Sequence, residues 1–204
     1  MHGEKSVVHE KHVGIVLKNY FPKKCKLSLL DNKMGKIAGV PQSSNHIAAG
    51  SLIEYSLVEQ TSCSFLYNIN VHDVPFKLAY HDILFLHHVL EICYYFMPIK
   101  SYNPTVFILL QILYTSDSWL YAMSVKKLFL LKLFVLLGLY PEDEKFKIPS
   151  FHLLTSLPFT QMLNEQIGSY NEDAIDEWLR SCIASHPIAG KFKTTYFLDS
   201  CREI

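Results

Sequence analysis

Apolar and polar residues alternate along the first part of the chain at the spacing of β-strands. A period of two places every second side chain on one face of a sheet, and Asn and Gly residues between the runs mark turns. The pattern predicts strands at Val7–Lys18, Lys26–Leu30, Lys36–Val40, Ser51–Glu59 and Ser64–Val71. Five short strands within about 70 residues are typical of a small barrel. An OB-type barrel fits this spacing, and an SH3-like barrel fits it as well.

The pattern changes near Val74-Pro75, where apolar residues begin to recur every three or four positions. This period is that of helices with one buried face. Asn103 before Pro104 is a typical helix start, and Gly138 is a typical helix end. The predicted helices are Ala79–Met97, Pro104–Tyr114, Val125–Leu137, Phe151–Leu154, Thr160–Ile167 and Glu172–Ser185. The expected fold class is therefore α+β, with an N-terminal OB-fold β-barrel in residues 1–77 and an all-α helical domain in residues 78–204.

Two apolar runs, Ile83–Met97 and Phe129–Tyr140, are the strongest in the chain. Polar residues interrupt both, and a membrane-spanning helix needs roughly 20 mostly apolar residues. We therefore expect buried helices and no membrane span. The first residues are too polar for a signal peptide, and the five widely spaced cysteines contain no CxxC pair. These features favour reduced thiols and a cytoplasmic protein.

Charge is unevenly distributed although the formal net charge is zero. Residues 1–50 hold eight lysines and three acids, a formal charge of +5, and residues 142–204 hold six basic and ten acidic residues, a formal charge of −4. Lysines near the predicted barrel suit phosphate contacts, and aromatic residues beside them suit stacking on unpaired bases. The candidate nucleic-acid-binding residues are Lys18, Tyr20, Phe21, Lys23, Lys24, Lys26, Lys33 and Lys36. The alternative is a solvated barrel rim with its aromatic rings in the core.

Motifs for chemistry are missing from the sequence. The chain has no GxSxG, GxxxxGK[ST] or HExxH motif, and its histidines lack Cys or carboxylate partners at the spacing of zinc sites. The acidic residues between Glu172 and Glu177 are typical of an exposed helix face. We expect no catalytic site, no metal site and no cofactor.

Three segments share the order of motifs seen in one protein family. They are Gly14-Ile15-Val16-Leu17 with Gly35-Lys36-Ile37, then Phe129–Gly138 followed by Tyr140-Pro141, and finally Trp178-Leu179-Arg180 with Lys191–Leu198. Together they resemble the opening barrel, central helix and closing segment of the bacterial RecO family of DNA repair proteins. The chain departs from that family in three places. Residues 142–149 lack the cysteines of its zinc module, Pro41–His46 lacks basic residues, and Thr194-Thr195 replaces an Arg pair.

The resemblance implies a DNA repair and recombination mediator in the bacterial cytoplasm, associated with the nucleoid. Its barrel would bind single-stranded and double-stranded DNA and promote annealing or recombinase loading. Its helical domain would recruit RecR and the C-terminal tail of single-stranded-DNA-binding protein. Lys132 matches a lysine of the family's central helix, and Lys126 and Lys127 lie near it.

A lysine at the lip of an apolar groove suits an acidic-hydrophobic peptide, whereas lysines can also extend from a buried helix to solvent. The alternative function is a protein-interaction adaptor on the same fold with little or no DNA binding.

Overall fold

A computed structural model describes residues 10–42, 46–60, 63–115, 121–140, 151–164, 172–194 and 197. The chain forms two compact units. The first comprises Met1–Val74 together with Pro98–Pro104, and the second comprises Pro75–Met97 together with Thr105–Ile204. The chain therefore enters the second unit, returns briefly to the first, and then completes the second.

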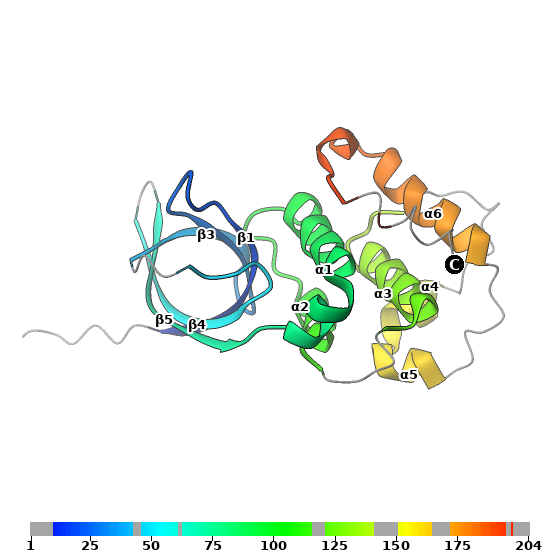
Figure 1. Ribbon diagram of the computed structural model, residues 1–204, viewed down its shortest axis with the longest axis horizontal. Coiled ribbons are helices and arrows are strands. Elements are labelled where there is room, and N and C mark those ends of the chain that lie inside the picture. Colours follow the sequence, from blue (N-terminus) through cyan, green and yellow to red (C-terminus); the bar gives the residue numbers. More distant parts are fainter. Residues whose placement is uncertain are drawn as a thin grey trace, which may run out of the picture. The chain divides into compact units, whose positions relative to one another are not determined.

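The first unit is a closed five-stranded β-barrel (Figure 1). Its strands are β1 (Lys11–Asn19), β2 (Leu27–Asp31), β3 (Gly35–Pro41), β4 (Leu52–Glu59) and β5 (Ser64–Asp73). The order around the barrel is β1-β2-β3-β5-β4, and β4 pairs with β1 to close it. The β3–β5 pair is parallel and the other pairs are antiparallel. The five predicted strands are confirmed within a few residues, except that residues 7–9 lie outside the described part of the chain.

Side chains from every strand fill the barrel. The buried cluster consists of Val16, Leu27, Leu29, Ile37, Ile47, Ile53, Tyr55 and Leu66. Burying a side chain of this size stabilises a fold by about 1.5–3 kcal/mol relative to leaving it exposed. The alternation that predicted the strands is the same alternation that fills this core, because inward positions recur every second residue.

The returning segment Pro98–Pro104 lies against the start of β3. The Lys100 amide donates to the Lys36 carbonyl at 2.8 Å, and Ile99 forms a parallel bridge with Lys36. Gly35 makes this close approach possible, because a Cβ there would lie 2.0 Å from the Ser101 carbonyl oxygen. Its φ of +76° is also a conformation that favours glycine.

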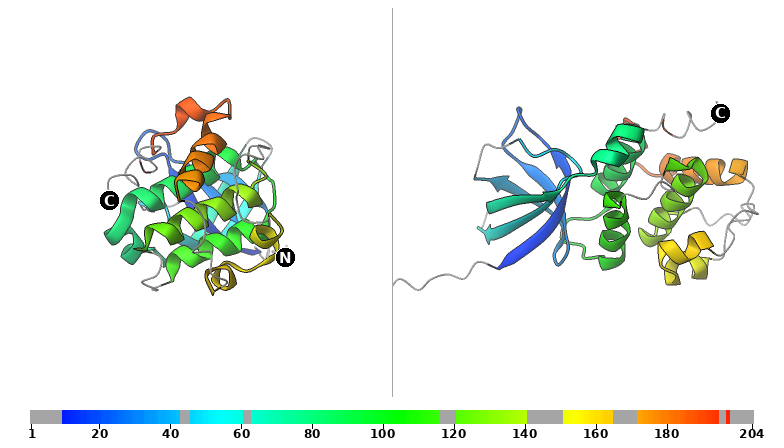
Figure 2. Two further views of the ribbon diagram at one scale, coloured as in Figure 1. Left: turned by 90° about the vertical axis from the view of Figure 1, so that its right-hand side faces the viewer. Right: turned by 60° about the horizontal axis from the view of Figure 1, so that its bottom comes forward.

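The second unit is helical. Its elements are α1 (Phe76–Phe96), α2 (Pro104–Gln111), the 3₁₀ turn η1 (Ile112–Tyr114), α3 (Met123–Leu136), α4 (Phe151–Ser156), α5 (Phe159–Asn164), α6 (Glu172–Ala184) and η4 (Ala189–Lys191). The helix α3 is buried from Lys126 to Val135 and packs against α4, α5 and α6 (Figure 2). The predicted helices are confirmed, although the end of the predicted Thr160–Ile167 helix lies outside the described residues.

A kink divides α1 at Asp82, whose φ of −155° and ψ of 80° are not helical. The Asp82 carboxylate accepts a hydrogen bond from the Phe85 amide at 2.9 Å, as an N-cap does. Its second oxygen pairs with the Lys126 ammonium. Asp82 thus starts the second half of α1 and links it to α3.

In the part of the chain that the structure describes, no helix is long and apolar enough to cross a membrane.

Candidate nucleic-acid interface

The connection between β1 and β2, residues 20–26, is held in shape by its own hydrogen bonds. The Tyr20 amide donates to the Lys26 carbonyl at 3.1 Å, and the Lys24 amide donates to the Tyr20 carbonyl at 3.1 Å. The Asn19 carboxamide oxygen accepts from the Phe21 amide at 2.8 Å. Because its backbone is internally bonded, this β1–β2 loop presents its side chains in a defined arrangement.

The ring of Tyr20 has two lysines close to it. The Lys18 ammonium is 5.2 Å and the Lys26 ammonium 6.0 Å from the centre of the Tyr20 ring. A cation within about 6 Å of an aromatic face is attracted by the ring quadrupole. Tyr20 therefore has both ammonium groups close to its ring.

Phe21 has a different environment from Tyr20, because its side chain is 57% exposed. It meets the ring of His46 edge to face, with centroids 5.9 Å apart and planes at 89°. His46 belongs to the connection between β3 and β4. Two loops that are distant in sequence therefore bring aromatic rings together at the barrel surface.

The lysines of the β1–β2 loop differ from those elsewhere on the barrel. Three lysines outside the loop form ion pairs, namely Lys11 with Glu54, Lys33 with Glu10, and Lys100 with Glu59. Lys23, Lys24 and Lys26 are exposed, and none of them pairs with an acid among the described residues. Their charge is therefore available to an anion.

Lys33 and Lys36 were predicted to belong with these lysines, and the structure does not bring them together. Lys33 lies in the β2–β3 turn and Lys36 at the start of β3, at the opposite end of β2 from the loop. Five residues of β2 correspond to a separation of about 14 Å at roughly 3.4 Å per residue. All eight residues are close together in the sequence, but the β1–β2 loop and the β2–β3 turn lie at opposite ends of β2, so the fold separates them into two groups.

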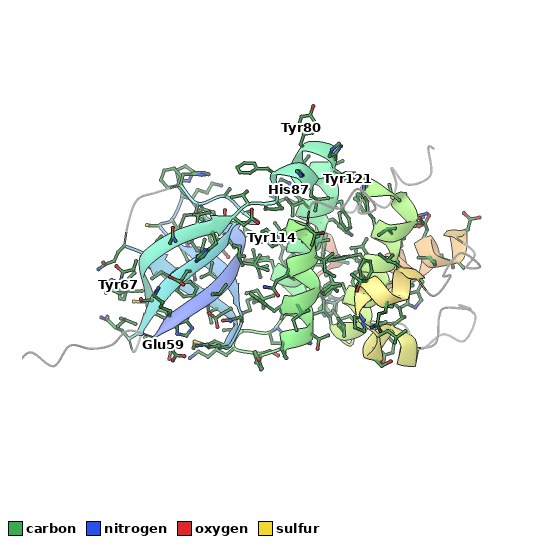
Figure 3. All side chains as sticks on the ribbon, turned by 90° about the horizontal axis from the view of Figure 1, so that it is seen from below. Glu59, Tyr67, Tyr80, His87, Tyr114 and Tyr121 are labelled. Atoms are coloured by element: carbon green, nitrogen blue, oxygen red, sulfur yellow. The ribbon has the colours of Figure 1, made fainter. Side chains whose placement is uncertain are left out.

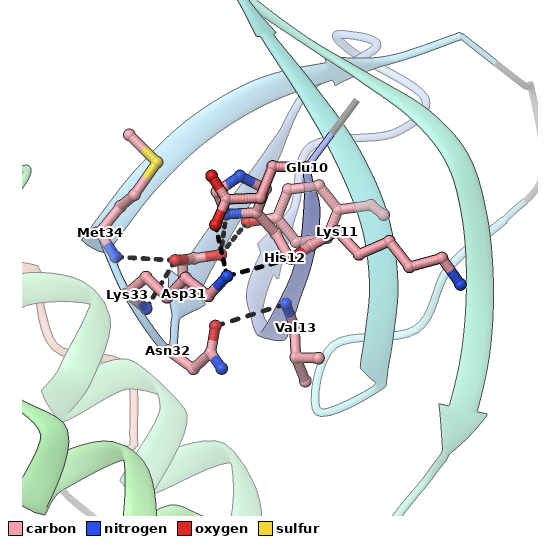
Figure 4. A network of polar contacts seen from close by, with 9 residues as sticks. Glu10, Lys11, His12, Val13, Asp31, Asn32, Lys33 and Met34 are labelled. Atoms are coloured by element: carbon pink, nitrogen blue, oxygen red, sulfur yellow. Dashed lines mark hydrogen bonds and ion pairs between the residues drawn. The ribbon is translucent and has the colours of Figure 1, made fainter. Parts of the chain in front are cut away.

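The far end of the hairpin is organised by Asp31 (Figure 4). One carboxylate oxygen accepts from the amides of Lys33 and Met34, at 2.8 and 2.7 Å, and so shapes the turn. The other accepts from the Tyr55 hydroxyl at 2.5 Å and lies 3.2 Å from His12 Nδ1. Burial, and then the neighbouring carboxylate, raise the pKa of Tyr55. Asp31 is only 1% exposed, so this polar cluster stabilises the barrel and is not accessible to a ligand.

The lysines predicted to bind a partner peptide are in the interior of the helical unit. Lys126, Lys127 and Lys132 are 5%, 3% and 3% exposed. Lys126 pairs with Asp82, and Lys127 pairs with Asp176 at 3.1 Å. The prediction that they line the lip of a groove is therefore wrong in its geometry, because each side chain is directed at a partner inside the fold.

Lys132 is buried without an acidic partner among the described residues. Its ammonium donates to the carbonyls of Leu154 and Leu157, at 2.5 and 2.7 Å. Burial lowers the pKa of Lys132. The lysine thus satisfies the carbonyls at the end of α4, which have no partner within that helix.

Two residues of the interface were missed by the sequence analysis, Asn19 and His46. The Asn19 amide group donates to the Ile47 carbonyl at 2.8 Å while its oxygen accepts from Phe21. His46 belongs to the segment Pro41–His46, whose lack of lysine and arginine gives no sign of an anion-binding surface. An Asn at the end of a strand before an aromatic residue was a usable signal, because Asn side chains commonly bond a backbone amide two residues on.

The described residues contain no group of three or more His, Cys, Asp or Glu side chains arranged to hold a metal ion. His88 is buried, and its Nδ1 lies 2.8 Å from the Thr194 hydroxyl. Burial lowers the pKa of His88 to about 4, so the ring is neutral at physiological pH.

Comparison with known proteins identifies no family for this chain. No protein-family model matches the chain, and no curated protein has a matching sequence.

Proposed function

We propose that the barrel is of the OB type and binds nucleic acid without catalysing a reaction. The strand order β1-β2-β3-β5-β4 with a parallel β3–β5 pair supports this assignment. OB-type barrels bind oligonucleotides with the face of β2 and β3 and with the β1–β2 and β4–β5 loops. The observation that carries the proposal is the structure of the β1–β2 loop. Hydrogen bonds hold its backbone in place, and its lysines and the ring of Phe21 are exposed.

The lysines account for most of the proposed affinity. Lys23, Lys24 and Lys26 would contact phosphates, and each phosphate neutralised releases condensed counterions. Contacts with phosphates position the nucleic acid but do not distinguish one base sequence from another. Binding is therefore sensitive to salt and tolerant of sequence.

The role that fits such binding is that of a mediator of DNA repair and recombination, similar to the RecO family. The protein would promote annealing or recombinase loading on DNA, and it would recruit single-stranded-DNA-binding protein and RecR. This part of the proposal is supported by the ordered motifs from Gly14 to Leu198. Recruitment would use a surface other than Lys126, Lys127 and Lys132, because their ammonium groups are engaged inside the helical unit.

A salt titration of binding to fluorescently labelled DNA tests the proposal. We expect affinity to fall steeply between about 50 and 200 mM salt, with a log–log slope of about −0.7 for each phosphate contacted on a single strand. The double variant Lys23→Gln, Lys24→Gln should weaken binding and make the slope shallower by about 1.4. Lys100→Gln is the matched control, because Lys100 is already paired with Glu59. Absence of binding at low salt, or binding indifferent to salt, contradicts the proposal.

The adaptor remains a second candidate, and a cluster of aromatic rings around the exposed Tyr80 of the helical unit favours it. Tyr80 is 88% exposed and projects from α1 (Figure 3). Its ring centroid is 5.4 Å from that of His81, which lies 4.1 Å from that of Tyr121. Lys77, three residues before Tyr80 on α1, is also exposed, and a lysine near aromatic rings suits an acidic-hydrophobic peptide.

Calorimetry with such a peptide separates the two functions. The adaptor requires peptide binding that Tyr80→Asp abolishes and that Lys23→Gln, Lys24→Gln leaves intact. Peptide binding that is unchanged by Tyr80→Asp contradicts this site.

A further inference from the structure

Phe21 and His46 form an exposed aromatic pair that neither the barrel core nor the ion pairs explain. Phe21 is 57% exposed although its side chain has no polar group that needs water. The residue does not owe its exposure to a loose backbone, because its amide is bonded to Asn19. An apolar ring held in solvent by a fastened loop is available to a ligand.

Asn19 holds both loops of this pair in place. Its carboxamide oxygen accepts from the Phe21 amide at 2.8 Å, and its nitrogen donates to the Ile47 carbonyl at 2.8 Å. One side chain therefore sets the position of the β1–β2 loop and of the residue that follows His46. Asn19 is a positioning residue for the ring pair.

The neighbouring Tyr20 does not offer the same surface. The ammonium groups of Lys18 and Lys26 lie over its ring, so its face is directed at cations of the protein itself. Phe21 has a T-shaped contact with His46 and remains 57% exposed, so much of its ring surface is open to a ligand. The two aromatic residues therefore have different roles, Tyr20 in orienting lysines and Phe21 in contacting a ligand.

We propose that Phe21 and His46 form a stacking subsite for an unpaired base, and that this interface therefore prefers single-stranded nucleic acid to duplex. The inference rests on the proposed nucleic-acid binding and specifies its ligand. The lysines around the subsite attract the phosphates of either form. Only a single strand can present the face of a base to Phe21, because duplex bases are already stacked on one another.

The experiment compares ligands that carry similar phosphates but different bases. Fluorescence anisotropy is measured with a labelled thymidine strand of roughly 20 nucleotides, longer than the 4–16 that one barrel covers. The other ligands are an abasic strand of the same length, a uridine strand and a duplex. We expect the wild type to bind the thymidine strand about fivefold or more tightly than the abasic strand, as stacking of one base provides. The uridine strand shows whether the interface also binds RNA.

The variants separate stacking from phosphate contact. Phe21→Ala should remove the preference for thymidine over abasic strand and leave the slope against salt unchanged. His46→Ala should reduce the preference by about twofold or more, since an edge-to-face partner contributes modestly. Lys23→Gln, Lys24→Gln should weaken both strands equally. Phe76→Ala, at an exposed Phe of the helical unit, should change nothing.

The failures of the two proposals are distinct. If no ligand binds at low salt, the proposed nucleic-acid binding is wrong, and the proposed stacking subsite is then wrong as well. If the thymidine, abasic and duplex ligands bind equally and with salt dependence, nucleic-acid binding stands and the stacking subsite is wrong. A preference for the thymidine strand that survives Phe21→Ala also overturns the assignment.

Discussion

The Tyr55 hydroxyl donates a hydrogen bond to the Asp31 carboxylate inside the barrel, at 2.5 Å. Tyr55 is on β4 and Asp31 ends β2, two strands that are not neighbours in the barrel. The same carboxylate also shapes the β2–β3 turn through the amides of Lys33 and Met34. One buried carboxylate therefore connects the turn geometry to the opposite wall of the barrel.

Burial of Tyr55, together with its contact with Asp31, should make the barrel less stable at alkaline pH. The pKa of Tyr55 is raised by burial and by Asp31, so the folded state keeps a proton that the unfolded state releases above about pH 10. The contribution of Tyr55 is complete below that pH and declines by up to about 1.4 kcal/mol per pH unit above it. Tyr55→Phe should lower the free energy of unfolding by about 1.5–3 kcal/mol at neutral pH, because the lost hydrogen bond is to a charged group. The variant should also show a shallower decline with pH, because it lacks the titrating hydroxyl.

Urea denaturation followed by far-ultraviolet circular dichroism, between about pH 9 and 11, measures both effects. All other titrating groups are shared by wild type and variant, so the difference isolates Tyr55. Equal slopes for the two proteins would show that Tyr55 titrates normally.

Gly35 should be far less tolerant of substitution than Gly138. Both have positive φ, +76° and +69°. Either change to Ala has a conformational cost of about 1–2 kcal/mol. A Cβ at Gly35 would in addition collide with the Ser101 carbonyl, whereas nothing lies within 4 Å of a Cβ at Gly138. We expect Gly35→Ala to lower the urea midpoint of the barrel clearly more than Gly138→Ala lowers that of the helical unit, and similar losses would argue against the packing of Pro98–Pro104 on β3.

Replacement of Lys132 should destabilise the helical unit rather than remove a binding function. Lys132→Met keeps the volume but leaves the carbonyls of Leu154 and Leu157 without their donor, which costs about 1–3 kcal/mol. Lys132→Glu should cost more, because it places a buried negative charge against those carbonyl oxygens. Lys77→Met, at an exposed lysine of α1, is the control and should stay within about 0.5 kcal/mol. Tryptophan fluorescence during urea denaturation follows this unit, since Trp178 is buried in it. A fully stable Lys132→Glu variant would contradict the buried position.

Glu91 should hold the segment around Thr194 against α1. Its carboxylate accepts from the amides of Lys193 and Thr194, at 3.0 Å each, and from the Thr194 hydroxyl. Glu91→Ala removes all three bonds, so we expect amide exchange at residues 193 and 194 to accelerate by about tenfold or more, as a loss of roughly 1.4 kcal/mol implies. Thr194→Val removes only the hydroxyl and should have a smaller effect. Hydrogen–deuterium exchange measures both variants, and unchanged exchange in Glu91→Ala would refute the anchoring role.

The strands and helices could be predicted because their cause is local. Alternation along Gly35–Pro41 puts Ile37 in the barrel and leaves Lys36 half-buried, whatever lies beyond the strand. Likewise, Gly138 ends α3 in a left-handed conformation that the residue itself permits, and its amide donates to Val135. Such features need only the neighbours in sequence, and predictions of them were correct.

The candidate interface could be predicted only in part. A single run of lysines between residues 18 and 36 does not reveal that a hairpin sends Lys33 and Lys36 to the other end of β2. Nor does it reveal that His46 returns to Phe21, because that contact depends on how the β3–β4 connection closes. The lysines of α3 show the same limit, since the acids that pair with Lys126 and Lys127 are 44 and 49 residues away.

By itself, the sequence determined a small β-unit followed by helices and a cationic N-terminal part, since residue pattern and charge are local properties. Only the tertiary structure decided which cations remain available. Acidic side chains form ion pairs with Lys11, Lys33 and Lys100. The side chains of Lys126, Lys127 and Lys132 are buried in the helical unit. A lysine's role is set by which charge or carbonyl the fold places beside it, and that neighbour is usually distant in sequence.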